Sequence, residues 1–322
     1  MQQVTVSVCT ITYNHADYIA QTIESVLAQT GPGLVVEMVI GDDGSSDGTR
    51  EIIAGYAARY PHQIKPLFHE KNLGANANTR ACLLACTGEF IAALEGDDYW
   101  TDPTKLHRQV EALRAAPDCA MCFHDAAFVY EANSVDRDKE NWKDSFAEQY
   151  PLILPATTEP EQPCVRFSQQ DIVRLGHFMP TPSLLFRASS IPRPLPDWFL
   201  KVYAGDTTMQ LLSTAHGPAL YLPRRMAAYR KHAGGLSLTS RSSLKRNIST
   251  IWQTQHYLRI FDRSLAPYFE SSLEQLYFER SLLHQGLGQQ GKRLFYYGCA
   301  LTVNRRVFFG HFKRLASRFL QR

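Results

Sequence analysis

The 322-residue chain has no long hydrophobic run, and its number of cysteines is odd. No segment approaches the roughly 18 consecutive apolar residues that a membrane-spanning helix needs. The N-terminus enters a strand pattern almost at once, which disfavours a secretory signal. Seven cysteines lie scattered among apolar neighbours, a pattern that favours reduced thiols over a disulfide framework. We therefore expect a cytoplasmic protein.

The chain also lacks the glycine loops of two nucleotide-binding enzyme classes. A nicotinamide-dependent enzyme needs Gly-x-Gly-x-x-Gly after its first strand, where this chain has Thr10-Ile-Thr-Tyr-Asn-His15. A sugar-nucleotide pyrophosphorylase normally carries a Gly-rich loop with a basic residue near its start, and none is present. Both classes are disfavoured.

Positive charge is scarce in the first three quarters of the chain and concentrated at the end. Residues 241–322 hold 14 Lys/Arg and 4 Asp/Glu, whereas residues 1–240 hold 20 and 27. The net charge of +3 therefore conceals an acidic front and a basic C-terminal part, for which we expect separate electrostatic roles.

Strand and helix signals alternate over the first 130 residues, which is typical of an α/β sheet. Strands are predicted at 4–11, 35–40, 64–69, 90–94 and 119–124, and helices at 18–27, 52–60, 76–86 and 103–115. A polar, proline-containing stretch at 131–165 predicts a long surface loop or lid. Further signals include a strand at 183–186, a helix at 207–215 and a strand at 226–230, and the pattern beyond Gly235 is helical.

Three carboxylates follow the strand at 90–94 within four residues: Glu95, Asp97 and Asp98. Like charges this close repel one another, and a hard cation such as Mn²⁺ or Mg²⁺ relieves the repulsion. Such an ion can neutralise a departing diphosphate. A solvated acidic turn before the helix near Pro103 explains the same residues without a metal, so both interpretations stay open.

A second acidic pair, Asp42 and Asp43, directly follows another strand. Ligands bind open α/β sheets at the carboxyl ends of strands, so we expect the two acidic loops to face one site. A carboxylate there can accept the imide N–H of uracil, and Tyr13, after the first strand, can stack on a base. The alternatives are an Asx turn at Asp42 and a buried Tyr13.

Four segments together resemble family 2 glycosyltransferases in order and spacing. They are Val6-Ser-Val-Cys-Thr-Ile-Thr-Tyr-Asn14, Ile40-Gly-Asp-Asp-Gly-Ser-Ser-Asp-Gly-Thr49, Asn72-Leu-Gly74 and Thr87-Gly-Glu-Phe-Ile-Ala-Ala-Leu-Glu-Gly-Asp-Asp-Tyr-Trp100. The resemblance is strong over residues 4–125, weaker over 166–240 and absent beyond. It implies the GT-A nucleotide-diphospho-sugar transferase fold, a Rossmann-like mixed sheet flanked by helices, here with a helical C-terminal extension. It also implies transfer with inversion.

The resemblance also implies roles for individual residues. Nucleotide-binding positions are Ile11, Tyr13, Asp42, Asp43, Arg80 and Asp97. Metal positions are Asp98, Asp97 and Glu95. The family's usual Asp-x-Asp begins here with Glu95, which leaves open which two of the three carboxylates contact the ion. Arg80 suits diphosphate oxygens, with a surface ion pair as the alternative.

On the acceptor side, the resemblance implies that Asp206 is the general base, and a plain helix N-cap fits that residue equally well. Arg230 and His232 match the family's closing segment, where a basic or imidazole group meets the diphosphate or the metal. Trp100 is a candidate for lining the acceptor site, with core packing as the alternative.

The end of the chain predicts a basic amphipathic helix. Residues 291–322 carry eight Lys/Arg and no acid, and Phe308, Phe312, Leu315 and Phe319 fall on one helical face. Such a helix is typical of attachment to an anionic membrane surface, here the inner face of the plasma membrane. Packing on the core or on a second subunit, as a homodimer, is the alternative. No motif indicates a nucleic-acid partner.

These observations predict a glycosyltransferase of the hexosyl- or N-acetylhexosaminyltransferase class. We expect a UDP-sugar donor and a saccharide or lipid-linked acceptor in surface polysaccharide biosynthesis. Residues 1–125 would form the nucleotide-sugar-binding half, 126–240 the acceptor-binding half of the same domain, and 241–322 the basic helical region. The alternative is a non-catalytic sugar- or nucleotide-binding protein that retains the fold.

Overall fold

The computed structural model describes residues 3–132, 143–155, 163–235 and 244–303. The chain divides into two compact units. The first comprises Met1–Leu200 and Gly205–Thr239, and the second comprises Lys201–Ala204 and Ser240–Arg322.

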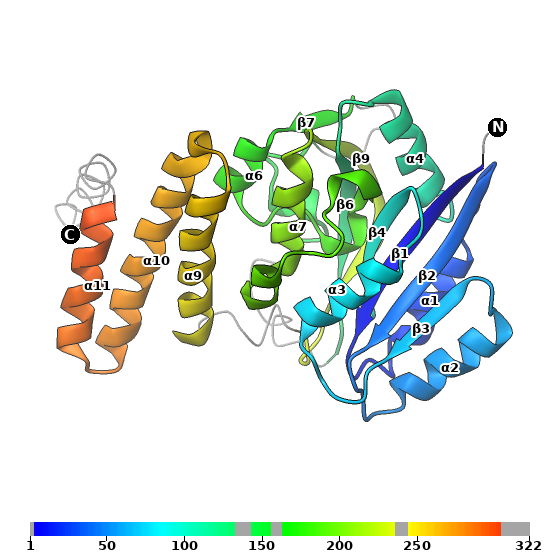
Figure 1. Ribbon diagram of the computed structural model, residues 1–322, viewed down its shortest axis with the longest axis horizontal. Coiled ribbons are helices and arrows are strands. Elements are labelled where there is room, and N and C mark those ends of the chain that lie inside the picture. The colour runs from blue at the N-terminus through cyan, green and yellow to red at the C-terminus, as the bar shows by residue number, and fades with distance from the viewer. Residues whose placement is uncertain (1–2, 133–142, 156–162, 236–243, 304–322) are drawn as a thin grey trace. The chain divides into compact units, whose positions relative to one another are not determined.

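The first unit is built on one mixed sheet with the strand order β3-β2-β1-β4-β8-β6-β9-β5, and β7 also pairs with β9 (Figure 1). Neighbours among the first four strands pair in parallel, β8 is antiparallel to β4 and β6, and β6 is parallel to β9. The strands are β1 (Val4–Thr12), β2 (Leu34–Asp42), β3 (Ile64–Phe68), β4 (Phe90–Glu95), β5 (Tyr99–Trp100), β6 (Met121–Tyr130), β7 (Val165–Phe167), β8 (Leu185–Arg187) and β9 (Ala219–Lys231).

Strand β1 lies inside the sheet and is covered on both faces. Val4, Val6 and Val8 are buried on one face, and Ser7 and Cys9 are buried on the other. Burial on both sides is the usual state of a parallel strand between helical layers. Its run of β-branched residues therefore predicted its position well.

Helices pack on both faces of this sheet through apolar residues three and four positions apart. In α1 (Ile19–Leu27) these residues are Ile19, Ile23 and Val26. Figure 1 shows α3 (Ala75–Ala85) in front of β1 and β2, and α1 behind them. In its described part the first unit also contains α2 (Thr49–Arg59), α4 (Lys105–Ala115), α5 (Phe146–Gln149), α6 (Gln169–Leu175) and α7 (Gly205–Thr214), with 3-10 turns at Thr181–Ser183 and Ala188–Ser190. A further 3-10 turn spans Asp197–Lys201.

The second unit is helical in its described part. It contains α9 (Leu244–Ile260), a 3-10 turn at Arg263–Leu265, α10 (Ala266–Gly286) and α11 (Gln290–Val303). Helix α10 packs against both α9 and α11. Within the described ranges, no helix combines the length and apolarity needed to cross a bilayer. The amphipathic helix predicted around Phe308–Phe319 lies outside the described residues.

The α/β sheet and the helical extension are confirmed, but three predicted segments are wrong in extent. The strand predicted at 226–230 begins earlier, at Ala219. The sequence hid its first half, because Pro223, Arg224 and Arg225 interrupt the apolar pattern. Its partner β6 continues to Tyr130 past a shift of register next to Asp125, a bulge that the sequence pattern does not reveal. The predicted loop at 131–165 contains the short helix α5.

Candidate active site

Both acidic loops lie at the same edge of the sheet. Strand β1 lies between β2 and β4, and Ile11 of β1 pairs with Gly41 on one side and Glu95 on the other. The loop that begins at Asp42 and the loop that begins at Glu95 are therefore one strand apart. Parallel pairing sets this arrangement, because it brings the carboxyl ends of neighbouring strands together.

The loop after β4 crowds three carboxylates together. Glu95, Asp97 and Asp98 each offer an oxygen, and the three oxygens lie within 4.8 Å of one another. Asp98 is 1% exposed, and its Oδ1 accepts a hydrogen bond of 2.8 Å from the backbone N–H of Arg230. Its Oδ2 is buried and has no hydrogen-bond partner among the described residues. The loop therefore offers an unused buried acceptor in a negative environment.

Crowding and burial shift the acidity of these groups. Burial, with the negative charges of Asp97 and Asp206, raises the pKa of Glu95 to about 8. Burial also raises the pKa of Asp98 well above its ordinary value, and the charges of Asp97 and Glu95 add to that effect. Without further positive charge, this part of the site favours protonated carboxyls.

Gly96 allows this loop to pack closely against the end of β1. A Cβ at this position would lie 2.4 Å from Oγ1 of Thr12, and the backbone N–H of Gly96 donates to the Ile11 carbonyl at 2.9 Å. Any side chain would therefore push the loop away from β1.

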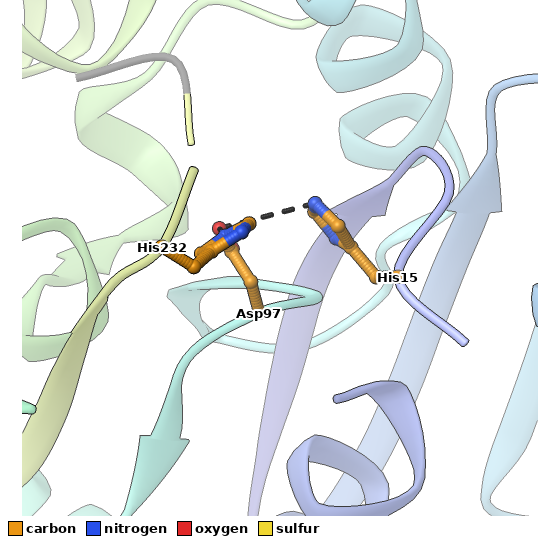
Figure 2. Close-up of side chains that lie close together, drawn as sticks. All are labelled: His15, Asp97 and His232. Carbon is orange, nitrogen blue, oxygen red and sulfur yellow. Dashed lines mark hydrogen bonds and ion pairs between the residues drawn. The ribbon is translucent and has the colours of Figure 1, made fainter. Parts of the chain in front are cut away.

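Asp97 faces two histidines that come from distant parts of the chain (Figure 2). Its Oδ2 lies 3.0 Å from Nε2 of His232, just beyond β9, and 3.8 Å from Nε2 of His15, just beyond β1. Burial alone would raise the pKa of Asp97, but the hydrogen bond from His232 and the charges of both imidazoles hold it below its ordinary value. Burial lowers the pKa of His15, although Asp97 opposes that shift.

His15 was not among the predicted site residues. Its position two residues after Tyr13, just beyond the carboxyl end of β1, is a signal that points to this edge. Asn14 has a positive φ of 56° and turns the chain there. The pairing of His15 with Asp97, however, spans 82 positions and follows only from the sheet order.

Arg230 lies at the site, where its side chain supports the acidic loop. Nη1 donates to the Asp97 carbonyl at 2.6 Å, Nε donates to Glu131 at 2.9 Å, and Nη2 donates to Gln21. The side chain is largely enclosed, and its guanidinium lies over the ring of Tyr18 at 4.9 Å. Its charge therefore stays next to the loop in a fixed orientation.

The loop after β2 is held by hydrogen bonds within the protein. Asp42 is fully buried, with Oδ1 accepting from the backbone of Ser45 at 3.3 Å and Oδ2 from Arg50 at 3.2 Å. Asp43 accepts from the backbone N–H groups of Leu73 and Gly74 at 2.7 and 3.0 Å. In this structure Asp42 and Asp43 therefore shape their own loop, as the alternative of a turn at Asp42 predicts.

Two other predicted nucleotide contacts lie near the surface. Tyr13 is 45% exposed, so the alternative of a buried tyrosine is wrong. Arg80 donates to Asp197 at 2.7 Å, and Asp197 is largely exposed. The structure thus shows the surface ion pair that was the alternative for Arg80.

Asp206 lies in the first turn of α7, close enough to the acidic loop for its charge to raise the pKa of Glu95. Trp100 does not line an open surface, and here the packing alternative holds. It is 5% exposed, its indole N–H donates to the Pro182 carbonyl at 2.8 Å, and the Lys105 ammonium lies 3.8 Å from the ring centroid. An aromatic ring enclosed in this way has no face left for a sugar.

Comparison with known proteins gives consistent matches. The family model described as glycosyl transferase family 2 matches residues 7–175. An uncharacterized protein of Mycobacterium tuberculosis is 32% identical over 238 residues, which are 71% of this chain and 60% of that protein. TuaG of Bacillus subtilis, named for teichuronic acid biosynthesis, is 39% identical over 118 residues, 37% of this chain and 45% of TuaG.

Solved structures share the fold at low identity. Staphylococcus aureus TarS (residues 1–349) in complex with UDP-GlcNAc matches with a TM-score of 0.61 at 16% identity, covering 94% of this chain and 81% of TarS. The mannosyltransferase PcManGT of Pyrobaculum calidifontis, with GDP-Man and Mn²⁺, matches with a TM-score of 0.55 at 14% identity and covers 98% and 81%. The first unit thus has the GT-A fold.

Proposed function

The chain belongs to glycosyl transferase family 2, and from this membership we propose that it transfers a sugar from a UDP-sugar to an acceptor hydroxyl with inversion. The acceptor is a saccharide or a lipid-linked saccharide in surface polysaccharide biosynthesis, a process that the name of TuaG supports. The observation that carries the proposal is the cluster of Glu95, Asp97 and Asp98 beside Asp206. Residues 1–125 bind the donor and residues 126–240 the acceptor.

The carboxylate cluster fits a divalent cation. Three oxygen donors lie within 4.8 Å of one another, and the buried Oδ2 of Asp98 has no partner in the described part of the chain. Oxygen-rich sites of this kind suit Mn²⁺ or Mg²⁺. Such an ion, when bound, supplies Lewis-acid stabilisation to the negative charge of the departing diphosphate.

The loops around the cluster position the nucleotide. Tyr13 offers an exposed ring on which a base can stack. Asp42 and Asp43 fix the backbone beside it through the hydrogen bonds described above. UDP is proposed as the nucleotide because TarS, which shares the fold, was solved with UDP-GlcNAc. Arg80, when released from Asp197, is a candidate for the diphosphate.

Asp206 is proposed to accept the proton of the acceptor hydroxyl. In an inverting reaction the hydroxyl oxygen attacks the anomeric carbon from the face opposite the leaving group, and a carboxylate near that oxygen removes its proton. Asp206 lies in a helical first turn, so its backbone position is fixed by α7. The effect of its charge on Glu95 supports a position beside the proposed donor site.

A transfer assay with a panel of nucleotide sugars, with and without Mn²⁺, tests this proposal. We expect release of the nucleoside diphosphate from one donor in the presence of acceptor and Mn²⁺. Asp98→Asn should lower the rate by about 10²–10³-fold, because it removes a charge-stabilising group at the site. The matched control is Asp118→Asn, an exposed aspartate that pairs with Arg166 and lies just before the start of β6.

Two outcomes would contradict the proposal. Nucleotide-sugar binding without turnover across the panel, with or without Mn²⁺, would favour the non-catalytic alternative. An Asp98→Asn protein as active as the control would mean that the carboxylate cluster is not the donor site.

The basic C-terminal part supports an additional proposal, attachment to an anionic membrane that presents a lipid-linked acceptor. Residues 241–322 hold 14 Lys/Arg against 4 Asp/Glu, and each basic group near such a surface contributes about 1 kcal/mol. Sedimentation with phosphatidylserine vesicles should lose most of the bound protein when residues 304–322 are deleted. Unchanged sedimentation would favour a role in subunit contacts, which measurement of oligomeric state would reveal.

A further inference from the structure

The second group of side chains around Asp97 differs in chemistry from the acidic cluster. His15, Asp97 and His232 offer ligand atoms that all lie within 4.8 Å of one another, and Figure 2 shows both imidazoles directed at the carboxylate. Asp97 belongs to both groups. Two imidazoles and one carboxylate form a donor set that suits a first-row transition ion, whereas a purely carboxylate site suits Mg²⁺ and Ca²⁺ as well.

The distances agree with a shared ion. Oδ2 of Asp97 lies 3.0 Å from Nε2 of His232 and 3.8 Å from Nε2 of His15. Two donors bound to one ion at about 2.1 Å each are separated by roughly 3 to 4.2 Å, depending on the angle between them. Both observed separations fall in that range.

His15 is also oriented as a metal-binding histidine would be. Its Nδ1 lies 3.1 Å from the Thr12 hydroxyl, which leaves Nε2 to face Asp97. In metal sites, a ligating histidine typically donates its other ring N–H to an oxygen, which fixes the tautomer and the ring. Thr12 is itself held against the acidic loop, because Gly96 has no side chain to separate them.

We propose that His15, together with Asp97 and His232, holds the divalent ion from its nitrogen-donor side, and that His15 makes the site prefer a transition ion such as Mn²⁺ over Mg²⁺. This inference rests on the proposed function, because it concerns the same ion. His15 follows β1, Asp97 follows β4 and His232 follows β9, so the ion would join the three segments that surround the donor.

Pulsed EPR of the full chain with Mn²⁺ and UDP tests the inference directly. We expect ¹⁴N couplings from two imidazoles in the wild-type protein and from one in His15→Phe, which keeps a ring but removes both nitrogens. Calorimetry with UDP present should show Mn²⁺ affinity reduced by about tenfold or more, with a smaller change for Mg²⁺. The control is His62→Phe, an exposed histidine between α2 and β3.

A second variant covers a folding defect in His15→Phe. His15→Gln offers an amide oxygen instead of a nitrogen and should lower the ratio of Mn²⁺ to Mg²⁺ affinity while thermal unfolding stays cooperative. An unchanged ratio and unchanged ¹⁴N couplings in the folded variants would overturn the inference. If the wild-type protein binds Mn²⁺ through Asp98 but shows no ¹⁴N coupling, the inference about His15 is wrong and the proposed function stands. If the protein binds no Mn²⁺ in the presence of UDP, the proposed function is wrong as well.

Discussion

The two acidic loops at the carboxyl edge of the sheet satisfy their carboxylates in opposite ways. After β2, Asp42 and Asp43 accept hydrogen bonds from a guanidinium and from backbone N–H groups. After β4, Glu95 and Asp98 face each other with raised pKa values, and one buried oxygen of Asp98 lacks a partner in the described residues. The carboxylates of the first loop are satisfied within the protein, whereas those of the second loop are crowded and keep raised pKa values despite the nearby charge of Arg230.

This difference predicts a structural role for the loop after β2 and a ligand-binding role for the loop after β4. A carboxylate surrounded by protein donors stabilises the fold and is destabilising to remove. Carboxylates crowded without such donors cost stability until a ligand neutralises them. The two loops should therefore differ in how much stability they lose when one of their carboxyl groups is replaced.

The largest effect on turnover should come from Asp206 of α7, whose charge acts on the second loop, the one after β4. Asp206→Asn removes the proposed base and should lower the turnover number by about 10²–10⁴-fold, while donor affinity changes little. Rates of UDP release and calorimetric titration of the UDP-sugar with Mn²⁺ measure the two quantities. Equal losses of turnover and donor affinity would show that Asp206 contributes to binding rather than to proton transfer.

A matched control for this variant lies at the exposed surface. Asp171→Asn also changes an aspartate in the first turn of a helix, here in the capping box of α6. It should reduce stability slightly and leave turnover unchanged. A similar loss of turnover in both variants would mean that Asp206 acts only as a helix-stabilising residue.

The sequence predicted the edge of the sheet where the site lies, because strand ends and acidic turns are local features. Strands β1 and β2 appear as runs rich in β-branched residues and β4 as a short apolar run, and the polar residues follow each run directly. Parallel pairing of neighbouring strands then places the loops together without knowledge of the side chains. The membership in a known family, shown by the match over residues 7–175, added the expected fold.

The sequence could not predict which side chains pair across that edge. The contacts of Asp97 with His15 and His232 span 82 and 135 positions and depend on the full strand order. Trp100 illustrates the same limit, because its burial depends on Lys105 and on the carbonyl of Pro182, 82 positions away. Aromatic residues next to a motif can belong equally to a site or to the core, and only tertiary packing decides between them.

A smaller effect, on stability, should follow from changing the first loop. Asp43→Ala removes the acceptor for the backbone N–H groups of Leu73 and Gly74, and we expect a loss of about 1–2 kcal/mol in the free energy of unfolding. Asp98→Asn without metal should cost less, because burial and crowding already raise the pKa of this carboxyl and favour its neutral form, which asparagine resembles. Urea denaturation of both variants measures the contrast, and a larger loss for Asp98→Asn would contradict the comparison.

The smallest effect concerns the pH dependence of the metal-free protein. Because the pKa of Glu95 is raised to about 8 when folded, the folded state retains a proton that the unfolded chain loses above about pH 4.5, so stability falls as pH rises toward 8. His15, whose pKa is lowered, acts in the opposite direction, but only below about pH 6.5.

Between pH 7 and 8.5 the raised pKa values of the buried carboxyls Glu95 and Asp98 should therefore outweigh the effect of His15. We expect the melting temperature of the metal-free protein to fall by about 2–4 °C over this interval, which corresponds to about 1 kcal/mol. Glu95→Gln should weaken the pH dependence, because glutamine does not titrate. Saturating Mn²⁺ with UDP should raise the melting temperature most at the upper end of the interval. If the wild-type protein and Glu95→Gln show the same slope without metal, Glu95 titrates normally and crowding in the second loop does not raise its pKa.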